Sequence, residues 1–379
     1  MNRSSRASWR SSRRIDSPPS EAWRHSRQRS STVAPVPRVL LFAPATSYRV
    51  DAYRAAAAAL GAELTIATDI PAAFRGDATL AIDFSAPVEF AASLETAAFD
   101  GVVAVDEKSA LAAALAAVKL GCPFHAPEGV RATGHKLLMR RRLAEAGVAV
   151  PSFGGFVAPE AHGFPCVVKA PMLSGSQAVI RANDADELAR AVARIEGILA
   201  THPSPSRHQP AFFELIVEEY IDGVEVAVEA IVHNGVLQLL AIFDKPDPLT
   251  GPFFEETIYV APSSLEPAVL DRIVSVTTRA CVALGLHHGP VHAELRVGPQ
   301  GPVVIEVAPR SIGGLCAGGL APRLGSLEER IVLNALGRAP HPLPEAPPAV
   351  GMMMIPVPKS GVLAEVTGVA EASDGAGVR

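Results

Sequence analysis

Short apolar runs separated by helix-like stretches fill the first third of the chain. This pattern predicts buried strands at 38–43, 63–68, 79–84 and 101–105, with helices at 48–60 and 107–120. Glycine follows each helix, at Gly61 and Gly121, where it commonly ends a helix. Strands that alternate with helices are typical of a parallel sheet covered by helices. No GxGxxG turn follows the first strand, so we do not expect dinucleotide binding of the Rossmann kind.

The middle of the chain is predicted to form a smaller α+β unit. The pattern indicates a basic helix at 129–147, strands at 165–170, 177–181 and 212–220, and a helix at 184–199. We place the arginines of the basic helix on a solvated face. Strand 165–170 ends at Lys169 and continues into a loop of small residues that contains Ser174, Gly175 and Ser176. Backbone N–H groups in such a loop can bind oxyanions, and a lysine neutralises phosphate.

The last part of the chain contains two hairpin signals. Alternating apolar positions at 225–231 and 236–243 flank Asn234-Gly235, a strong turn signal. A second pair of runs, at 291–297 and 302–307, flanks Gly-Pro-Gln-Gly. A loop is expected at 244–256, helices at 267–284 and 326–336, and a further apolar run at 351–357.

The second hairpin carries the residues with the clearest chemistry. Glu294 lies in its first run and Glu306 in its second, and Arg310 follows with the loop 311–314. Two carboxylates on neighbouring strands can share a divalent cation, and an arginine beyond them can hold a phosphate. From these residues alone, a hairpin with two solvated glutamates is an equal alternative.

Composition limits the classes of protein that the chain can belong to. Its 379 residues suggest two or three domains, and a net charge of -5 argues against a general nucleic-acid binder. We expect no membrane span, because no apolar run is long enough. The four cysteines are widely spaced, which fits thiols in the core of a cytoplasmic protein. Residues 1–37 are rich in Arg and Ser, and we expect a disordered tail there rather than a targeting segment.

Taken together, from about residue 39 to residue 357, these motifs resemble the ATP-grasp superfamily, and within it the carboxylate–amine ligases. The resemblance implies an N-terminal parallel-sheet α/β domain, the pre-ATP-grasp domain, followed by an α+β ATP-grasp fold. The implied division is a tail at 1–37, the N-terminal domain at 38–125, a small nucleotide-binding subdomain at 126–220 and a metal and substrate subdomain at 221–379. We expect the last of these to be a truncated subdomain, since its final residues are small and polar.

The resemblance also implies an ATP site. Lys136, Lys169 and the loop Ser174-Gly175-Ser176 would hold the phosphates, and Lys169 would take part in catalysis. Glu218 would accept a hydrogen bond from the adenine amine, and the main chain of Glu219 and Ile221 would contact the ring edge. Glu225 would bind the ribose hydroxyls.

The same resemblance implies a metal centre at the second hairpin. Glu294 and Glu306 match residues that bind one or two Mg²⁺ ions, with Mn²⁺ as an alternative. Ala308 stands where relatives have asparagine, which puts a second ion in question, although water can complete a magnesium shell. Arg310 matches an arginine that steadies the transferred phosphate.

The implied reaction joins a small-molecule carboxylate to an amine. ATP would phosphorylate the carboxylate, and the amine would attack the acyl phosphate, giving an amide, ADP and phosphate. We expect Ser174–Gln177 and the loop 244–256 to close over the site. The candidates for substrate contacts are Lys245, Glu255, Glu256 and His292.

Several alternatives stay open at this stage. His292 is equally an interior histidine, and Glu255 and Glu256 are equally surface residues. A bicarbonate-activating, carboxylase-like enzyme is one rival function, and a non-catalytic ATP-binding protein, favoured by Ala308, is another. Dimers are common in the superfamily, so a homodimer is one candidate assembly.

Overall fold

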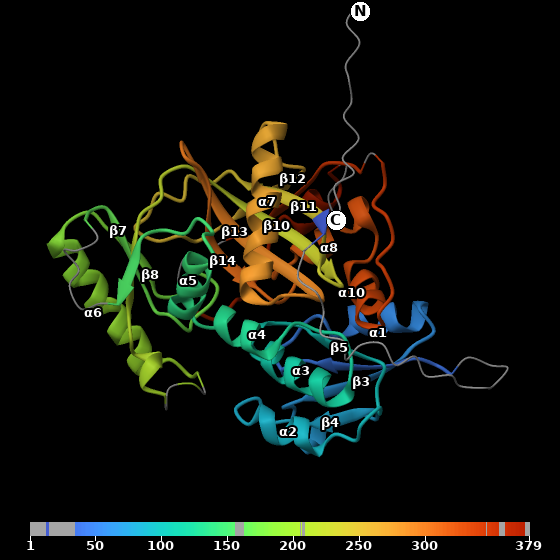
Figure 1. Cartoon of the computed structure of the whole chain (residues 1–379). Helices are drawn as coiled ribbons and strands as arrows, with labels where there is room; N and C mark the ends of the chain where they lie inside the picture. The colour runs from blue at the N-terminus through green and yellow to red at the C-terminus, as the bar shows by residue number, and fades with distance from the viewer. Residues whose placement is uncertain are drawn as a thin grey trace, which may run out of the picture.

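The computed structural model describes residues 35–155, 163–204, 206, 209–345, 347–355 and 361–375, together with the backbone of Arg13–Arg14. The expected disorder of residues 1–37 falls mostly outside these residues, as does the end of the apolar run at 351–357. Figure 1 shows three sheets, with a small one projecting to the side of a large one and a third beneath it. Among the described residues, no helix has the length and apolarity that a membrane crossing requires.

The first sheet is parallel, with strand order β4-β3-β2-β5. It consists of β2 (Arg38–Phe42), β3 (Glu63–Thr68), β4 (Thr79–Ala81) and β5 (Gly101–Ala104), with helices α1 (Val50–Ala59), α2 (Pro87–Ser93) and α3 (Glu107–Leu120). The side chains of Leu40 and Phe42 pack in one core with α3, and those of Val39 and Leu41 pack in another with α1. The predicted helix-covered parallel sheet is therefore confirmed.

The second sheet is small and antiparallel, with order β6-β9-β7-β8. Its elements are β6 (Phe153–Gly155), β7 (Cys166–Lys169), β8 (Val179–Ala182), α6 (Ala185–Thr201), the 3₁₀ turn η5 (Pro210–Phe212) and β9 (Ile216–Glu219). Asp184 caps α6 by accepting a 2.8 Å hydrogen bond from the backbone N–H of Glu187. Helix α6 covers one face of the sheet through Ile195 and Leu199.

The third sheet is the largest, with order β14-β13-β10-β11-β12-β15 and antiparallel pairing throughout. Its strands are β10 (Val224–His233), β11 (Val236–Lys245), β12 (Ile258–Ala261), β13 (Gly289–Gly298), β14 (Gly301–Ala308) and β15 (Val350–Met353), and the short β1 (Arg13–Arg14) pairs with β11. Helix α7 (Pro267–Leu284) packs on one face, and α10 (Leu327–Ala335) shares the core on the other face with β2 and α1. The first and third sheets are thus joined by one apolar core.

The remaining elements are short. They are η2 (Ala72–Phe74), α4 (Pro127–Thr133), α5 (Lys136–Glu145), α8 (Cys316–Gly319), α9 (Ala321–Leu324) and α11 (Val369–Ser373). All four cysteines lie buried, as predicted for cysteines of the core.

Three sequence predictions need correction. The basic helix expected at 129–147 is two helices, because Gly134 ends α4 and the extended backbone of His135 (φ -142°, ψ 103°) separates it from α5. The strand expected at 212–220 has only four residues, since the chain first forms the turn η5. The strand at 79–84 stops at Ala81. The short elements α2, β6 and β12 were not predicted, because a few residues carry too little periodicity.

Helix α4 packs closely against the end of α7 at Gly129, so a larger residue there should lower the stability of the fold. A Cβ at Gly129 would lie 2.0 Å from the carbonyl oxygen of Leu284. Gly129→Ala should therefore force the two helices apart and lower the free energy of unfolding by about 1–3 kcal/mol. Gly197→Ala is the matched control, because Gly197 lies in α6 with nothing within 4 Å of its added Cβ. It should stabilise the protein by about 0.5–1 kcal/mol in the same urea titration.

Buried histidines at the joint between the first and third sheets predict sensitivity to acid. Burial lowers the pKa of His125 to about 3 and that of His288 to about 4. His288 Nε2 lies 2.7 Å from the carbonyl oxygen of Asn334 in α10, and the backbone N–H of His288 donates to His125 Nδ1 at 3.4 Å. Since the unfolded chain takes up these protons at a higher pH than the folded chain, stability should fall as the pH drops from about 6.5 towards 4.

The contribution of His288 can be isolated by substitution. Between pH 7 and pH 5, the wild type should lose roughly 2 kcal/mol more than His288→Gln does, measured by denaturant unfolding at both pH values. His341→Gln, at an exposed position, is the control and should keep the wild-type pH dependence. Equal losses in wild type and His288→Gln would contradict the assignment.

Candidate active site

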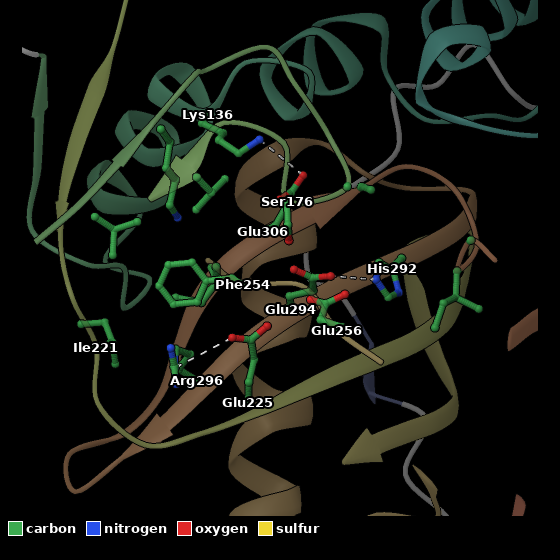
Figure 2. Close-up of a pocket in the computed structure, with 18 of the residues that line it drawn as sticks. Lys136, Ser176, Ile221, Glu225, Phe254, Glu256, His292, Glu294, Arg296 and Glu306 are labelled. Carbon is green, nitrogen blue, oxygen red and sulfur yellow. Dashed lines mark hydrogen bonds and ion pairs between the residues drawn. The ribbon is translucent and has the colours of Figure 1, made fainter. Parts of the chain in front are cut away.

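The predicted site residues converge on one cleft between the small sheet and the large sheet. The cleft is lined by Lys136, Lys169, Gly175, Ser176, Glu218, Glu219, Ile221, Glu225, Glu294, Glu306 and Arg310. Of the residues predicted to hold the nucleotide, the metal or the transferred phosphate, only Ser174 is absent from this lining, and it lies exposed in the loop before Gly175. Figure 2 shows labelled side chains of this lining, such as Lys136 and Glu225, reaching in from opposite sides. Among the proposed substrate contacts, Glu256 and His292 also line the cleft, whereas Glu255 is exposed.

A buried ion-pair network fixes one wall of the cleft. Glu218 at the end of β9 lies 2.6 Å from Lys169 Nζ and 2.7 Å from Arg140 Nε, and its side chain is only 1% exposed. Burial alone would raise the pKa of Glu218, but Arg140 and Lys169 outweigh this effect and lower it to about 2. In this structure the Glu218 carboxylate is therefore paired with two cationic side chains, and it is not free to accept the predicted hydrogen bond from an adenine amine.

Arg140 corrects a sequence interpretation. Its side chain is fully buried, so the arginines of this helix do not all lie on a solvated face. It also donates a 2.6 Å hydrogen bond to the carbonyl oxygen of Ile305 in β14, which ties α5 to the hairpin. The signal was present in the sequence, because Arg140 lies four residues after Lys136 and so shares its helix face.

The second predicted lysine bridges the small-residue loop and the hairpin. Lys136 Nζ donates a 2.5 Å hydrogen bond to the carbonyl oxygen of Leu173 and lies 3.8 Å from Glu306 Oε1. Burial raises the pKa of Glu306, and Lys136 offsets part of that rise. Lys136 and Lys169 thus bring two cationic side chains to one end of the cleft, where an anionic ligand would be stabilised.

Aromatic and cationic side chains surround the segment after β9. Arg181 and Arg296 both contact the ring of Tyr220, with guanidinium carbons 4.0 Å and 5.0 Å from its centroid. Phe254 from the loop after β11 stacks on Tyr220 at 6.5 Å and lines the cleft with Ile221. The rings of Tyr220 and Phe254 therefore give this part of the cleft a flat apolar surface beside the main chain of Ile221.

Three carboxylates meet at the buried Lys245. Its Nζ lies 2.8 Å from Glu225, 2.5 Å from Glu256 and 3.3 Å from Glu294. Burial raises the pKa of Glu256, nearby Glu294 raises it further, and the result is about 7 despite the attraction of Lys245. Oxygens of the three glutamates lie within 4.8 Å of one another, a spacing that suits a cation. In this structure the ammonium of Lys245 supplies the positive charge.

The hairpin β13–β14 has the predicted arrangement, with Glu294 directly opposite Glu306. One strand further into the sheet, Glu229 on β10 lies opposite His292 on β13, and its side chain is fully buried. Burial alone would raise the pKa of Glu294, but Lys245 and His292 lower it well below its usual range. His292 is thus a buried residue of the cleft wall, and its ring lies between two carboxylates.

Residues beside the first sheet contact the loop that carries Arg310. Arg310 lies 3.4 Å from Glu107 at the start of α3. Arg49 donates a 2.6 Å hydrogen bond to Ser311 Oγ, and Tyr48 donates a 2.8 Å hydrogen bond to the carbonyl oxygen of Gly314. These contacts were not predicted, because they join residues that are more than two hundred positions apart.

The donor set of the cleft fits magnesium and a polyphosphate. Glu294 and Glu306 present carboxylate oxygens, the ligands that Mg²⁺ prefers, from two paired strands. Lys136, Lys169 and Arg310 supply cationic groups around them. Ala308 offers only a methyl group at the third predicted ligand position, as expected from the sequence.

Comparison with known proteins identifies the fold. Residues 162–318 match the sequence model of the ATP-grasp domain. The crystal structure of L-amino acid ligase from Bacillus licheniformis superposes with a TM-score of 0.75 and 26% identity, covering 89% of this chain and 85% of that chain. Residues 162–318 therefore match an ATP-grasp domain, and the predicted fold is confirmed.

Two curated relatives match about half of this chain. Protein y4rH of Sinorhizobium fredii (strain NBRC 101917 / NGR234), described as uncharacterized, is 32% identical over 198 residues, which are 49% of this chain and 38% of that protein. Dapdiamide A synthase of Enterobacter agglomerans is 30% identical over 193 residues, which are 48% of this chain and 43% of that protein. The matched stretches span less than half the length of these relatives. These similarities are to a synthase and a ligase, which agrees with the class of protein that the sequence motifs resemble.

Proposed function

We propose that the protein is an ATP-dependent carboxylate–amine ligase that forms an amide or peptide bond through an acyl phosphate. The observation that carries this proposal is the cleft itself, where two lysines, two paired glutamates and an arginine surround one space. Likeness to an L-amino acid ligase over most of both chains supports the same reaction class.

In the proposed reaction, the substrate carboxylate attacks the γ-phosphorus of ATP and ADP leaves. Negative charge builds on the transferring phosphoryl group, and Lys169 and Arg310 stabilise it. Bound Mg²⁺, held by Glu294 and Glu306, would supply further charge neutralisation at the phosphates. The amine then attacks the acyl carbon, phosphate leaves, and a proton is lost from the nitrogen.

The nucleotide would lie along the wall formed by the small sheet. Lys136, Lys169 and the loop Ser174–Ser176 would face the phosphates. The main chain of Glu219 and Ile221 would contact the adenine edge. Because Glu218 is held by Lys169 and Arg140, its contribution would be to orient Lys169, and contact with the adenine amine would require that pair to rearrange. Glu225 would bind ribose by exchanging its contact with Lys245.

The substrate end of the cleft would lie near Glu256. This carboxylate accepts a 2.5 Å hydrogen bond from the hydroxyl of Tyr259 and pairs with Lys245, so a cationic group that enters the cleft would compete with Lys245 for it. Loop 244–256 would close over the acyl phosphate and exclude water, which protects the intermediate from hydrolysis.

Release of ADP and phosphate with a panel of carboxylic acids and amines tests the proposal. Turnover that requires both an acid and an amine, with the amide detected by mass spectrometry, is the expected result. Turnover that requires bicarbonate instead would indicate a carboxylase-like enzyme. Tight ATP binding without turnover across the panel would indicate a non-catalytic nucleotide-binding protein.

A further inference from the structure

We propose that His292 is a nitrogen ligand for the divalent cation of the hairpin, placed beside Glu294 and oriented by the buried Glu229. This inference deepens the proposed function, because it concerns the same metal centre. It makes that centre a mixed nitrogen and oxygen site rather than a site built from carboxylates alone.

The strand register places His292 across from the predicted ligand position that carries no ligand atom. His292 lies directly opposite Ala308 across the β13–β14 pair, just as Glu294 lies opposite Glu306. Residues two apart on a strand project from the same face, so His292 and Glu294 both point into the cleft. The methyl group of Ala308 can bind no cation, whereas the imidazole of its cross-strand partner can.

The distances suit two ligands of one ion. His292 Nε2 lies 3.4 Å from Glu294 Oε1, and Figure 2 shows the ring turned toward that carboxylate. Two atoms that occupy neighbouring positions around an octahedral cation lie about 3 Å apart when each bond is about 2.1 Å. A cation can therefore bind between them once Lys245, whose Nζ lies 3.3 Å from the same Glu294 oxygen, releases that contact.

The other side of the ring has the partner that a metal-binding histidine needs. His292 Nδ1 lies 3.4 Å from Glu229 Oε2, and the Glu229 side chain is fully buried. The same carboxylate accepts a 2.9 Å hydrogen bond from the backbone N–H of Ile312, which fixes it to the loop after Arg310. Histidine ligands commonly donate their second N–H to a carboxylate, which sets the tautomer and the ring orientation.

A nitrogen ligand changes which cation the site prefers. Imidazole suits metals such as Ni²⁺ and Zn²⁺, whereas carboxylates and water suit Mg²⁺ and Mn²⁺. We therefore expect Ni²⁺ to bind at least about tenfold more tightly than Mg²⁺ in the presence of ADP. His292→Ala should weaken Ni²⁺ binding by at least about tenfold and reduce this preference, since only oxygen ligands would remain.

Electron spin-echo spectroscopy on the whole chain, loaded with Mn²⁺ and ADP, tests the ligand directly. Protein labelled with ¹⁵N only in histidine should show a ¹⁵N coupling to Mn²⁺, which adenine and lysine nitrogens cannot produce. The coupling should disappear in His292→Ala and persist in His341→Ala, a surface control. Absence of any ¹⁵N coupling in the wild type would overturn the proposal without relying on a variant.

Glu229→Gln tests the orienting contact separately. The ¹⁵N coupling should persist, while Mn²⁺ affinity should fall by about 10–100-fold, as found for residues that support a ligand. Unchanged Mn²⁺ affinity would overturn the part assigned to Glu229. These readouts are independent of the ligase reaction, since a histidine coupling in a protein without turnover refutes only the proposed function, and turnover without the coupling refutes only the metal ligand.

Discussion

Replacement of Lys169 by methionine should lower the turnover of ATP by about 10²–10³-fold, which is the loss typical of one preorganised group that stabilises transition-state charge. Methionine has a similar length and keeps the packing of a side chain that is only 7% exposed. Glu218 would still be paired with Arg140 at 2.7 Å, so the variant does not leave a buried carboxylate without a counter-charge. The loss should therefore report on chemistry rather than on folding.

The kinetic pattern separates the two roles that Lys169 can have. If it acts mainly in the transition state, kcat and kcat/KM should fall together, whereas loss of simple ATP binding would raise KM and leave kcat unchanged. Lys119→Met is the matched control, since Lys119 lies exposed in the last turn of α3, and it should keep wild-type kinetics. Wild-type kcat in Lys169→Met would refute the catalytic role.

Local sequence patterns predicted the elements that build the cleft because each has its own signal. The hairpin that carries Glu294 and Glu306 alternates with a period of two and has a glycine-rich turn, which predicted both strands. The direct pairing of Glu294 with Glu306 depends on a register shift between Glu294 and Leu295 that this pattern does not show. Lys169 could be placed at a strand end because an apolar run stops there. These predictions depend only on neighbours in the sequence, so no tertiary information was needed.

The electrostatic partners could not be predicted, because they come from distant elements. Lys245 gathers carboxylates from β10, from β13 and from the loop before β12, and only the folded sheet brings these together. In the same way, Glu218 reads as an open acceptor in the sequence, while the structure shows it held by Arg140 and Lys169. Charge pairing across elements is therefore what the structure adds to the motif.

The second large effect on turnover is expected from replacing Glu306, the carboxylate beside Lys136. Glu306→Gln keeps the volume of the side chain but removes the negative charge that a cation needs, so turnover at saturating Mg²⁺ should fall by about 10³-fold. The same change removes the carboxylate that lies 3.8 Å from Lys136 Nζ. Without Mg²⁺, ATP should therefore bind at least as tightly as to the wild type, because Lys136 no longer has a competing anion beside it.

This opposite behaviour of binding and turnover distinguishes a metal ligand from a structural residue. Misfolding would weaken both, whereas loss of a metal ligand should abolish metal-dependent turnover and spare metal-free ATP binding, measured by calorimetry with EDTA present. Glu89→Gln, at an exposed position of α2, is the control and should change neither. Wild-type turnover in Glu306→Gln would refute the metal assignment, since one carboxylate, Glu294, would then suffice at the hairpin.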